Sequence, residues 1–364
     1  MDPPARILAR MRRAVAFVLV ASAVAPASAT AARIELGLAN QPGGARAMRR
    51  AAPFGYRYQY LAGGANTGNG WSTWDQNGTF VTRYVDESAK AQVTPVFTYY
   101  MIRQSLPGAH EGDELKADIG NLHNTSTMGA YWADLTLFFK RAGATHRRVI
   151  LHVEPDMWGY LEQAGDTRLA RSVAQHVVRL RNRFARNVAL GYQLSDWGTK
   201  ADLSIQDPPP AETDRLAVKA AAFYKSLHTR FDLVFAEFSD RDSGFKEHIE
   251  GMSHADAWWT ASDFARHARF LSGVHKLTRR PIFLWQIPLG NSGLPDTWTR
   301  YRDNRPQWLL GAGSRAHLKA YARAGVRALL FGGGADGSTS ERTDGGWFLA
   351  HARAYYRHPV KVGS

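Results

Sequence analysis

Eight short runs rich in β-branched and aromatic residues recur along the chain, and they constrain its fold more than any other feature. Gly, Pro, Asn or Asp bound each run. The runs are Ile34–Asn40, Tyr56–Gly63, Val93–Ile102, Val149–Glu154, Val188–Ser195, Leu233–Asp240, Ile282–Ile287 and Ala328–Gly333. Segments with apolar residues at helical spacing lie between them. These segments are Ala130–Arg141, Arg168–Arg186, Glu212–Thr229, Ser262–Leu277, Arg315–Ala324 and Trp347–Tyr356.

Strands that alternate with helices are expected to pair in parallel, because each crossover helix returns the chain to the same end of the sheet. Eight such units close into a barrel. We therefore predict an α/β fold, a single (β/α)₈ TIM barrel over residues 33–364. The alternative is a doubly wound open sheet, but no Gly-rich phosphate-binding turn follows the first run.

The connections between the runs are unequal in length. Long segments rich in Gly, Asn, Asp and Trp follow runs two, three, six, seven and eight, whereas returns such as Ala185–Asn187 and Thr278–Arg280 are short. In barrels of this kind the strand-to-helix loops build the active face. We therefore expect elaborated strand-to-helix loops that carry the functional residues.

Residues 1–32 have the pattern of an export signal. Four arginines, the last of them Arg13, precede the apolar stretch Ala14–Ala25, and Ala27-Ser28-Ala29 offers a small-residue cleavage site. The apolar stretch is too short to span a bilayer comfortably. We predict a cleaved signal peptide, a secreted protein (extracellular or periplasmic) and no stable membrane insertion.

The composition of the chain limits the kinds of partner and cofactor that we expect. The chain has no cysteine, which excludes disulfides and thiolate metal sites. Its formal net charge of +14 favours contact between a basic surface and anionic cell-wall polymers. The basic residues follow predicted helices rather than alternating with aromatic residues, so we expect no nucleic-acid partner. We also expect no cofactor, no metal and a monomer.

Acidic residues gather at the ends of the runs. Glu154 and Asp156 close the fourth run, and Glu237 and Asp240 close the sixth. Alternation predicts that Glu154 points into the barrel together with His152. Glycosidic cleavage needs one carboxylic acid to protonate the leaving oxygen and one carboxylate to activate water or attack the sugar. We expect Glu154 or Asp156 to be the acid and Glu237 or Asp240 to be its partner.

Aromatic and amide side chains at the same ends predict a sugar-binding wall. Nine of the 11 tryptophans lie on or after the ends of the runs. An indole plate matches the apolar face of a sugar ring, and nearby polar groups bind its hydroxyls. The candidate substrate-binding residues are Tyr99, Trp158, Gln193, Asp196, Trp197, Trp259, Trp285, Gln286 and Asp336.

The segment Glu154-Pro155-Asp156, directly after a β-rich run, resembles the Glu-Pro-Asp segment of family-6 cellulases. The chain departs from two other patterns of secreted barrel glycosidases. One has a glutamate at the end of strand seven, where this chain has Gln286, and the DxxDxDxE run of chitinases is missing. The resemblance implies a secreted barrel glycoside hydrolase acting on a polysaccharide or oligosaccharide, without assigning a family.

Three alternatives remain open. Individual acids could be structural partners of an arginine such as Arg103 or Arg241. The barrel could be a non-catalytic carbohydrate or cell-wall binder, in which the tryptophans matter and the acids do not. His152, Glu154 and Asp156 could together hold a divalent ion for a metal-dependent phosphodiesterase.

Overall fold

The computed structural model describes residues 32–239 and 241–362. The described chain forms a closed barrel of eight parallel strands in sequence order, and β8 pairs with β1. The strands are β1 (Glu35–Ala39), β2 (Tyr56–Leu61), β3 (Thr94–Tyr99), β4 (Val149–Val153), β5 (Val188–Leu194), β6 (Leu233–Glu237), β7 (Ile282–Ile287) and β8 (Val326–Phe331). This confirms the predicted (β/α)₈ TIM barrel.

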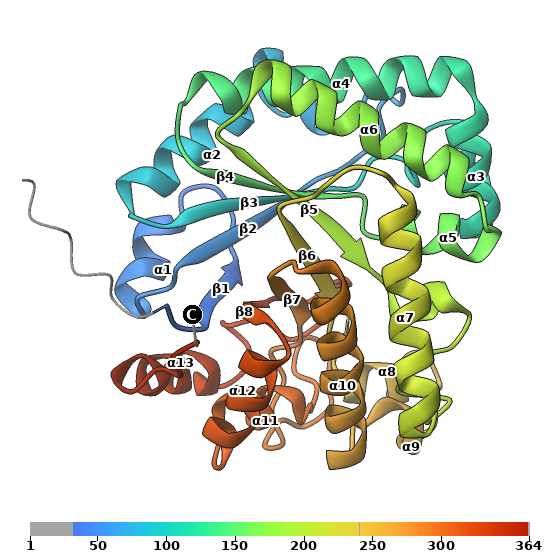
Figure 1. Ribbon diagram of the computed structural model, residues 1–364. Coiled ribbons are helices and arrows are strands. Elements are labelled where there is room, and N and C mark those ends of the chain that lie inside the picture. The colour runs from blue at the N-terminus through green and yellow to red at the C-terminus, as the bar shows by residue number, and fades with distance from the viewer. Residues whose placement is uncertain (1–31, 240, 363–364) are drawn as a thin grey trace, which may run out of the picture.

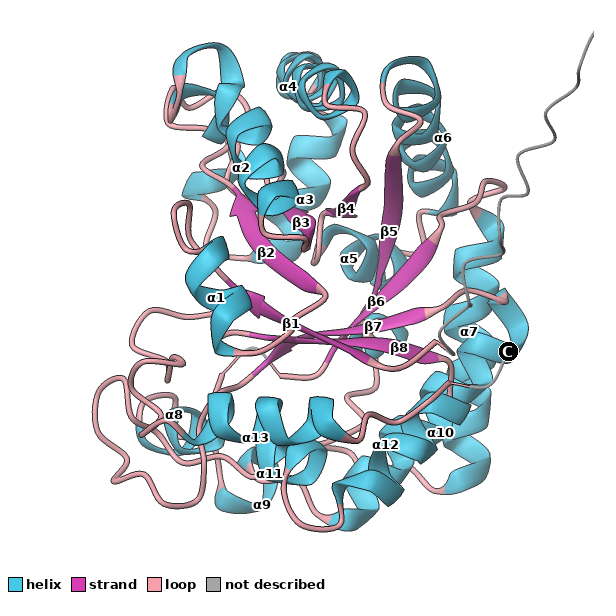
Figure 2. Cartoon of the chain, turned by 90° about the vertical axis from the view of Figure 1, so that its left-hand side faces the viewer, coloured by secondary structure: helices cyan, strands magenta, loops and turns pink. Residues whose placement is uncertain are grey.

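Helices surround the strands on all sides (Figures 1 and 2). They are α1 (Ala45–Ala51), α2 (Thr79–Lys90), α3 (Glu114–His123), α4 (Thr125–Ala144), α5 (Met157–Ala164), α6 (Thr167–Phe184), α7 (Pro210–Ser226), α8 (Ser243–His248), α9 (His254–Ala257), α10 (Ala261–Thr278), α11 (Arg305–Leu310), α12 (Ser314–Arg323) and α13 (Trp347–Arg357). Each of the six predicted helical segments overlaps one of them. The first described residues join the last through a bridge between Arg33 and Lys361.

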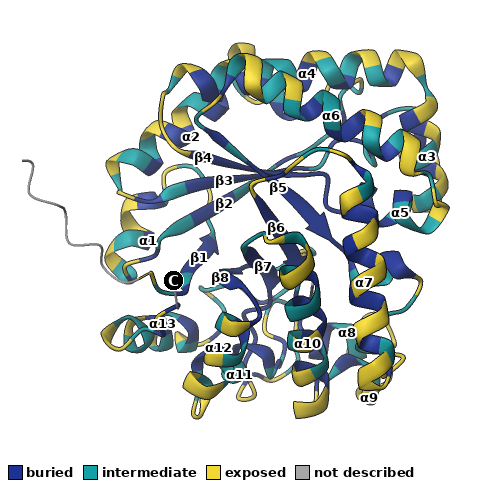
Figure 3. Ribbon diagram, in the orientation of Figure 1, coloured by how far each residue is buried: buried dark blue, intermediate teal, exposed yellow. Residues whose placement is uncertain are grey.

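Apolar side chains form two layers of core, because successive residues of a strand face opposite sides of the barrel wall. The outer layer packs between strands and helices, and Figure 3 shows exposed residues mainly on the outward faces of those helices. The inner layer fills the barrel and includes Ile150, Phe235 and Leu330. In β4, Val149, Leu151 and Val153 pack in the outer layer, on the side of the strand that alternation predicts.

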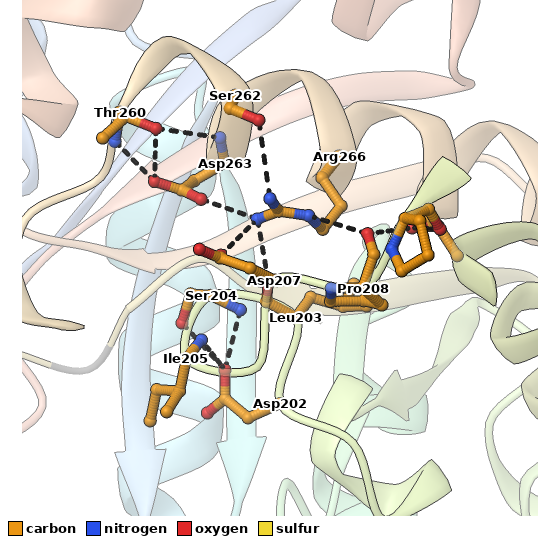
Figure 4. Close-up of polar contacts among 12 residues, drawn as sticks. Asp202, Leu203, Ser204, Ile205, Asp207, Pro208, Thr260, Ser262, Asp263 and Arg266 are labelled. Carbon is orange, nitrogen blue, oxygen red and sulfur yellow. Dashed lines mark hydrogen bonds and ion pairs between the residues drawn. The ribbon is translucent and has the colours of Figure 1, made fainter. Parts of the chain in front are cut away.

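The loops at the carboxyl ends of the strands are tied to the helices around them. After β5, a long loop runs to α7, and Arg266 of α10 donates hydrogen bonds to the backbone oxygens of Leu203 (3.1 Å) and Pro208 (3.2 Å) in this loop (Figure 4). Arg266 also pairs with Asp263, whose carboxylate caps the start of α10 at Thr260. The loop that begins at Asp196 is thereby held in one conformation.

Two sequence predictions concern membranes and export. Within the described ranges no helix combines the length and apolar character that a membrane span needs. The predicted signal peptide occupies residues 1–32 and falls, but for its last residue, outside the described part of the chain. It remains a prediction.

Candidate active site

A cavity of about 330 Å³ opens at the carboxyl ends of the strands. Its wall takes at least one side chain from each of β2 to β7 or from the few residues that follow each strand. These side chains are Tyr60, Tyr100, Asp156, Trp197, Glu237 and Gln286. The loop after β8 adds Gly334. The cavity therefore lies on the face where barrels of this class carry their active sites.

Asp156 is the first of two carboxyl groups in this wall. It is the residue before α5, and its partly buried carboxylate accepts a hydrogen bond from the Tyr100 hydroxyl. Burial raises the pKa of Asp156 to about 6, the hydrogen bond from Tyr100 opposes this rise, and the negative charge of Glu114 adds to it. Asp156 is therefore a carboxyl group poised to titrate just below neutral pH.

Glu237, the last residue of β6, is the second carboxyl group. Burial, together with the charges of Asp156 and Asp196, raises its pKa to about 7, although the charge of Lys246 and a hydrogen bond from Trp197 oppose this rise. Because the charge of Asp156 acts on Glu237, the two carboxyl groups titrate as an interacting pair. Burial thus favours the protonated form of both carboxyl groups relative to carboxyl groups in water.

The side chain of Trp197 packs against Tyr160 and donates a hydrogen bond to Glu237. Its indole lies against Gly159 of α5, where a Cβ atom would be 2.4 Å from the ring. The ring of Tyr160 packs on it at 4.9 Å. The hydroxyl of Tyr160 in turn donates to Glu114 at 2.6 Å. Gly159 is thus required for the indole to sit at this depth and reach Glu237.

A bulge in β7 places two consecutive side chains in the same cavity. The pairing of β7 with β8 shifts register between Leu284 and Ile287, and Gln286 has a φ of 51°. Trp285 and Gln286 therefore both line the cavity, although alternation would place them on opposite sides of the wall. Gln286 donates a hydrogen bond to the hydroxyl of Tyr60. Trp197, Trp285 and Gln286 thus all line the cavity, and their role in binding substrate stays a prediction.

Glu154 does not point into the barrel, which corrects the sequence prediction. Its φ of 47° breaks the strand alternation. The carboxylate is buried on the helix side, where it accepts hydrogen bonds from the backbone N–H groups of Met101 (3.1 Å) and Ile102 (3.3 Å). Burial raises the pKa of Glu154 well above its ordinary value. Glu154 is absent from the cavity wall.

His152 points into the barrel as expected. Its ring stacks on Phe235 at 4.0 Å, and its Nε2 is 2.9 Å from Oε1 of Gln193. Burial lowers the pKa of His152 to about 3, so the imidazole is neutral. Gln193 is consequently a partner of His152 inside the barrel rather than part of the cavity wall.

The three residues of the predicted metal site are dispersed. His152 lies inside the barrel, Glu154 faces the helices and Asp156 lies in the cavity. Across residues 32–239 and 241–362, no group of three or more His, Asp or Glu side chains is arranged to hold a metal ion. The geometry of the described residues thus gives the phosphodiesterase hypothesis no support.

Three predicted substrate-binding aromatics pack in the core instead. Tyr99 faces the helices and donates to Asp134, and its neighbour Tyr100 takes the place in the cavity. Trp158 is buried, with its Nε1 2.8 Å from the backbone oxygen of Val153. Trp259 packs against the ring of Phe238 at 5.0 Å. Most tryptophans near the strand ends thus serve the packing of loops and helices, and tyrosines supply much of the wall.

The remaining predicted acids lie at different places in the chain and do not share one site. Asp196 lies behind Trp197 and accepts its backbone N–H at 2.9 Å, and burial together with the charge of Asp202 raises the pKa of Asp196 to about 7. Asp336 lines a second cavity. Asp240 lies outside the described residues, so its catalytic role remains a prediction.

Sequence reasoning missed several wall residues. Tyr60 was detectable, since it alternates with Tyr56 and Tyr58 along β2 and so shares their inward face. Glu114 and Tyr160 belong to α3 and α5 and reach the cavity only through tertiary packing. Arg241 also lines the cavity, where it forms an ion pair with Glu250 at 2.7 Å.

The fold and site together define the class: a (β/α)₈ barrel with an aromatic cavity that holds two interacting carboxyl groups. No protein-family model matches the sequence. A search of curated proteins likewise gave no match. The likeness of this chain to known proteins is therefore structural.

Solved structures with the same fold include several glycoside hydrolases. A modular endo-β-1,4-mannanase of family 26 from Cellulomonas fimi is 13% identical, with 89% of this chain and 70% of that chain covered and a TM-score of 0.54. GH26C from a Muricauda species is 9% identical, with 90% and 86% covered and a TM-score of 0.56. Endoglucanase Cel5A from Thermotoga maritima is 10% identical, with 86% and 89% covered and a TM-score of 0.53. At these identities the likeness establishes the barrel fold.

A family-6 enzyme from Orpinomyces sp. Y102 aligns less well. It is 13% identical with a TM-score of 0.38, and the match covers 67% of this chain and 64% of that chain. This chain thus spans less than two thirds of that enzyme. The alignment adds no weight to the resemblance of Glu154-Pro155-Asp156 to family-6 cellulases.

Proposed function

We propose that this protein is a secreted glycoside hydrolase in which Glu237 and Asp156 cleave a glycosidic bond. The proposal rests on the presence of Asp156 and Glu237 in the wall of one cavity. Two carboxyl groups from different strands line one cavity, and their surroundings raise the pKa of Asp156 to about 6 and that of Glu237 to about 7. Glycosidic hydrolysis needs one protonated and one ionised carboxyl group at the same time.

We assign the role of general acid to Glu237, which reverses the roles expected from the sequence, because the charges of Asp156 and Asp196 beside it favour its protonated form. Glu237 gives its proton to the bridging oxygen while the C1–O bond breaks and the electron pair of that bond leaves with the departing sugar. Asp156, kept ionised with help from Tyr100, stabilises the positive charge at C1. It then either attacks C1 or takes a proton from the attacking water.

The wall of the cavity supports a sugar as the substrate. Trp197, Tyr160 and Trp285 line the cavity, where parts of their rings can contact the apolar face of a sugar, and Gln286 and Tyr60 place polar atoms beside them. We propose a polysaccharide or oligosaccharide as substrate. Mannan and glucan are the first to test, because the structural neighbours include a mannanase and an endoglucanase.

The test is release of reducing sugars from a panel of plant, fungal and bacterial-wall glycans by the purified protein and two variants. We expect Glu237→Gln and Asp156→Asn each to lower kcat by about 10²- to 10⁴-fold on the glycan that wild type cleaves. Glu154→Gln, the matched control outside the cavity, keeps turnover near wild type. Glycan binding without any release of products would assign the alternative function of a carbohydrate-binding barrel.

A further inference from the structure

A second and larger cavity lies beside the first. Its volume is about 810 Å³, and it opens between the loop after β1, which includes Asn40, and the loop after β8. Consecutive residues of the β8 loop line the two cavities. Gly334 lines the first cavity, while its neighbours Gly333 and Ala335 line the second. The two cavities therefore lie on either side of one short loop segment.

The wall of the second cavity has the chemistry of a site for sugar hydroxyls. It carries amide, hydroxyl and carboxylate groups, including those of Asn40, Gln41, Asp336 and Ser340. Its basic residue, Arg342, lies 3.5 Å from the carboxylate of Glu341. Two carboxylates beside one arginine disfavour a phosphate or another anion, whereas the amide, hydroxyl and carboxylate groups can all bind the hydroxyls of a neutral hexose.

An exposed tryptophan stands at the rim of this cavity. Trp298 is 58% exposed and lies on a tight turn closed by the bridge between Thr297 and Arg300. Its indole rests on Gly337 of the cavity wall, where a Cβ atom would be 2.3 Å from the ring. The neighbouring Thr299 donates its backbone N–H to the oxygen of Gly337 at 2.8 Å. The ring is thus fixed in position, with much of its surface open to a ligand.

The loops around the second cavity are held rigidly from below. Asp242, buried under the β6 loop, accepts backbone hydrogen bonds from Gly290 after β7 and from Thr339 after β8, both at 2.8 Å. Asp303 and Arg305 form a fully buried ion pair at 2.8 Å. Such bracing costs desolvation and yields a pre-shaped surface, as a binding site requires.

We propose that the second cavity is a subsite for further units of the same glycan, with Trp298 as its stacking platform. This inference rests on the proposed function and sharpens it, since the substrate becomes a neutral chain of several sugar units rather than a disaccharide. The scissile bond lies between Asp156 and Glu237, and the chain continues across Gly334 toward the β1 and β8 loops.

The test compares Trp298→Ala with Trp74→Ala, a control at another exposed tryptophan, which follows β2. The substrates are β-1,4-linked gluco- or manno-oligosaccharides of two to six units and a short aryl glycoside. Trp298→Ala should lower kcat/KM about tenfold on the longest chains and leave the aryl glycoside unchanged. Trp74→Ala should change neither. Equal losses on long and short substrates, or no loss on either, would overturn the subsite.

A binding measurement separates this inference from the proposed function. Calorimetric titration of Glu237→Gln with the same oligosaccharides should show affinity that rises with chain length, and adding Trp298→Ala should abolish that rise. Affinity independent of chain length in Glu237→Gln refutes the subsite even if the wild type cleaves glycans. Rising affinity that depends on Trp298 supports it even if no cleavage is ever detected.

Discussion

Two groups of buried acids lie at the carboxyl ends of the strands, and they differ in what surrounds them. In the mouth, Asp156 and Glu237 open onto a cavity and accept hydrogen bonds from aromatic side chains. Beneath the loops, Asp242 binds two backbone N–H groups and Asp303 holds a buried arginine. The pKa of Asp242 is raised to about 7 by burial, as is that of Glu237. A raised pKa therefore does not distinguish a chemical acid from a structural one, whereas its hydrogen-bond donors and its access to a cavity do.

We expect the largest loss of stability when a buried acid beneath the loops is replaced. Asp303→Asn leaves the guanidinium of Arg305 buried without its counter-charge, so the free energy of unfolding should fall by about 3–5 kcal/mol. Denaturant unfolding measures this loss. Asp156→Asn is the matched comparison from the first cavity and should cost little stability, because it removes a partly buried charge that forms no ion pair with any described residue. If both variants unfold alike, the division into two groups is wrong.

Glu154 provides a second test of the distinction between cavity acids and structural acids. It lies two residues before Asp156 in the chain but does not line the cavity. Glu154→Ala leaves the N–H groups of Met101 and Ile102 without an acceptor, which should lower the free energy of unfolding by about 1–3 kcal/mol. Glu154→Gln keeps one acceptor oxygen and should recover most of this stability with near-normal turnover. A loss of turnover in a well-folded Glu154→Gln variant would instead make Glu154 part of the chemistry.

The smallest effect is a shift in the pH profile. In the wild type, kcat/KM should be highest between about pH 6 and 7, where Asp156 is ionised and Glu237 is protonated. Tyr100 lowers the pKa of Asp156 through its hydrogen bond, so Tyr100→Phe should raise that pKa. The acidic limb of the profile should move to higher pH while the basic limb stays in place. An acidic limb that does not move would remove Tyr100 from this role.

The barrel was predictable from sequence because its signals are local. Each β-rich run and each short return between elements can be recognised without knowing what it contacts, and all eight strands overlap the predicted runs. Asp156, Glu237, Trp197, Trp285 and Gln286 were also found, since each lies at or directly after a strand end. Short helices such as α3 and α5 carried no strong pattern, so their cavity residues escaped detection.

The errors arose where the backbone departs from regular alternation. Glu154 turns away from the barrel at a positive φ, whereas regular alternation predicts that it points inward. The sequence does not show which of two consecutive tyrosines faces the cavity, and the structure places Tyr100 there, with Tyr99 against Asp134. Tryptophans such as Trp158 were misassigned because loop packing and ligand binding use the same residue type.

The leaving-group dependence of Glu237→Gln tests the central claim most directly. A dinitrophenyl glycoside departs without protonation, whereas a natural glycan needs a proton on the bridging oxygen. We predict that Glu237→Gln loses about 10²- to 10⁴-fold in turnover on the glycan but much less on the dinitrophenyl substrate, while Asp156→Asn is impaired on both. Equal losses on the two substrates in Glu237→Gln would contradict the assignment of Glu237 as the acid that protonates the departing sugar.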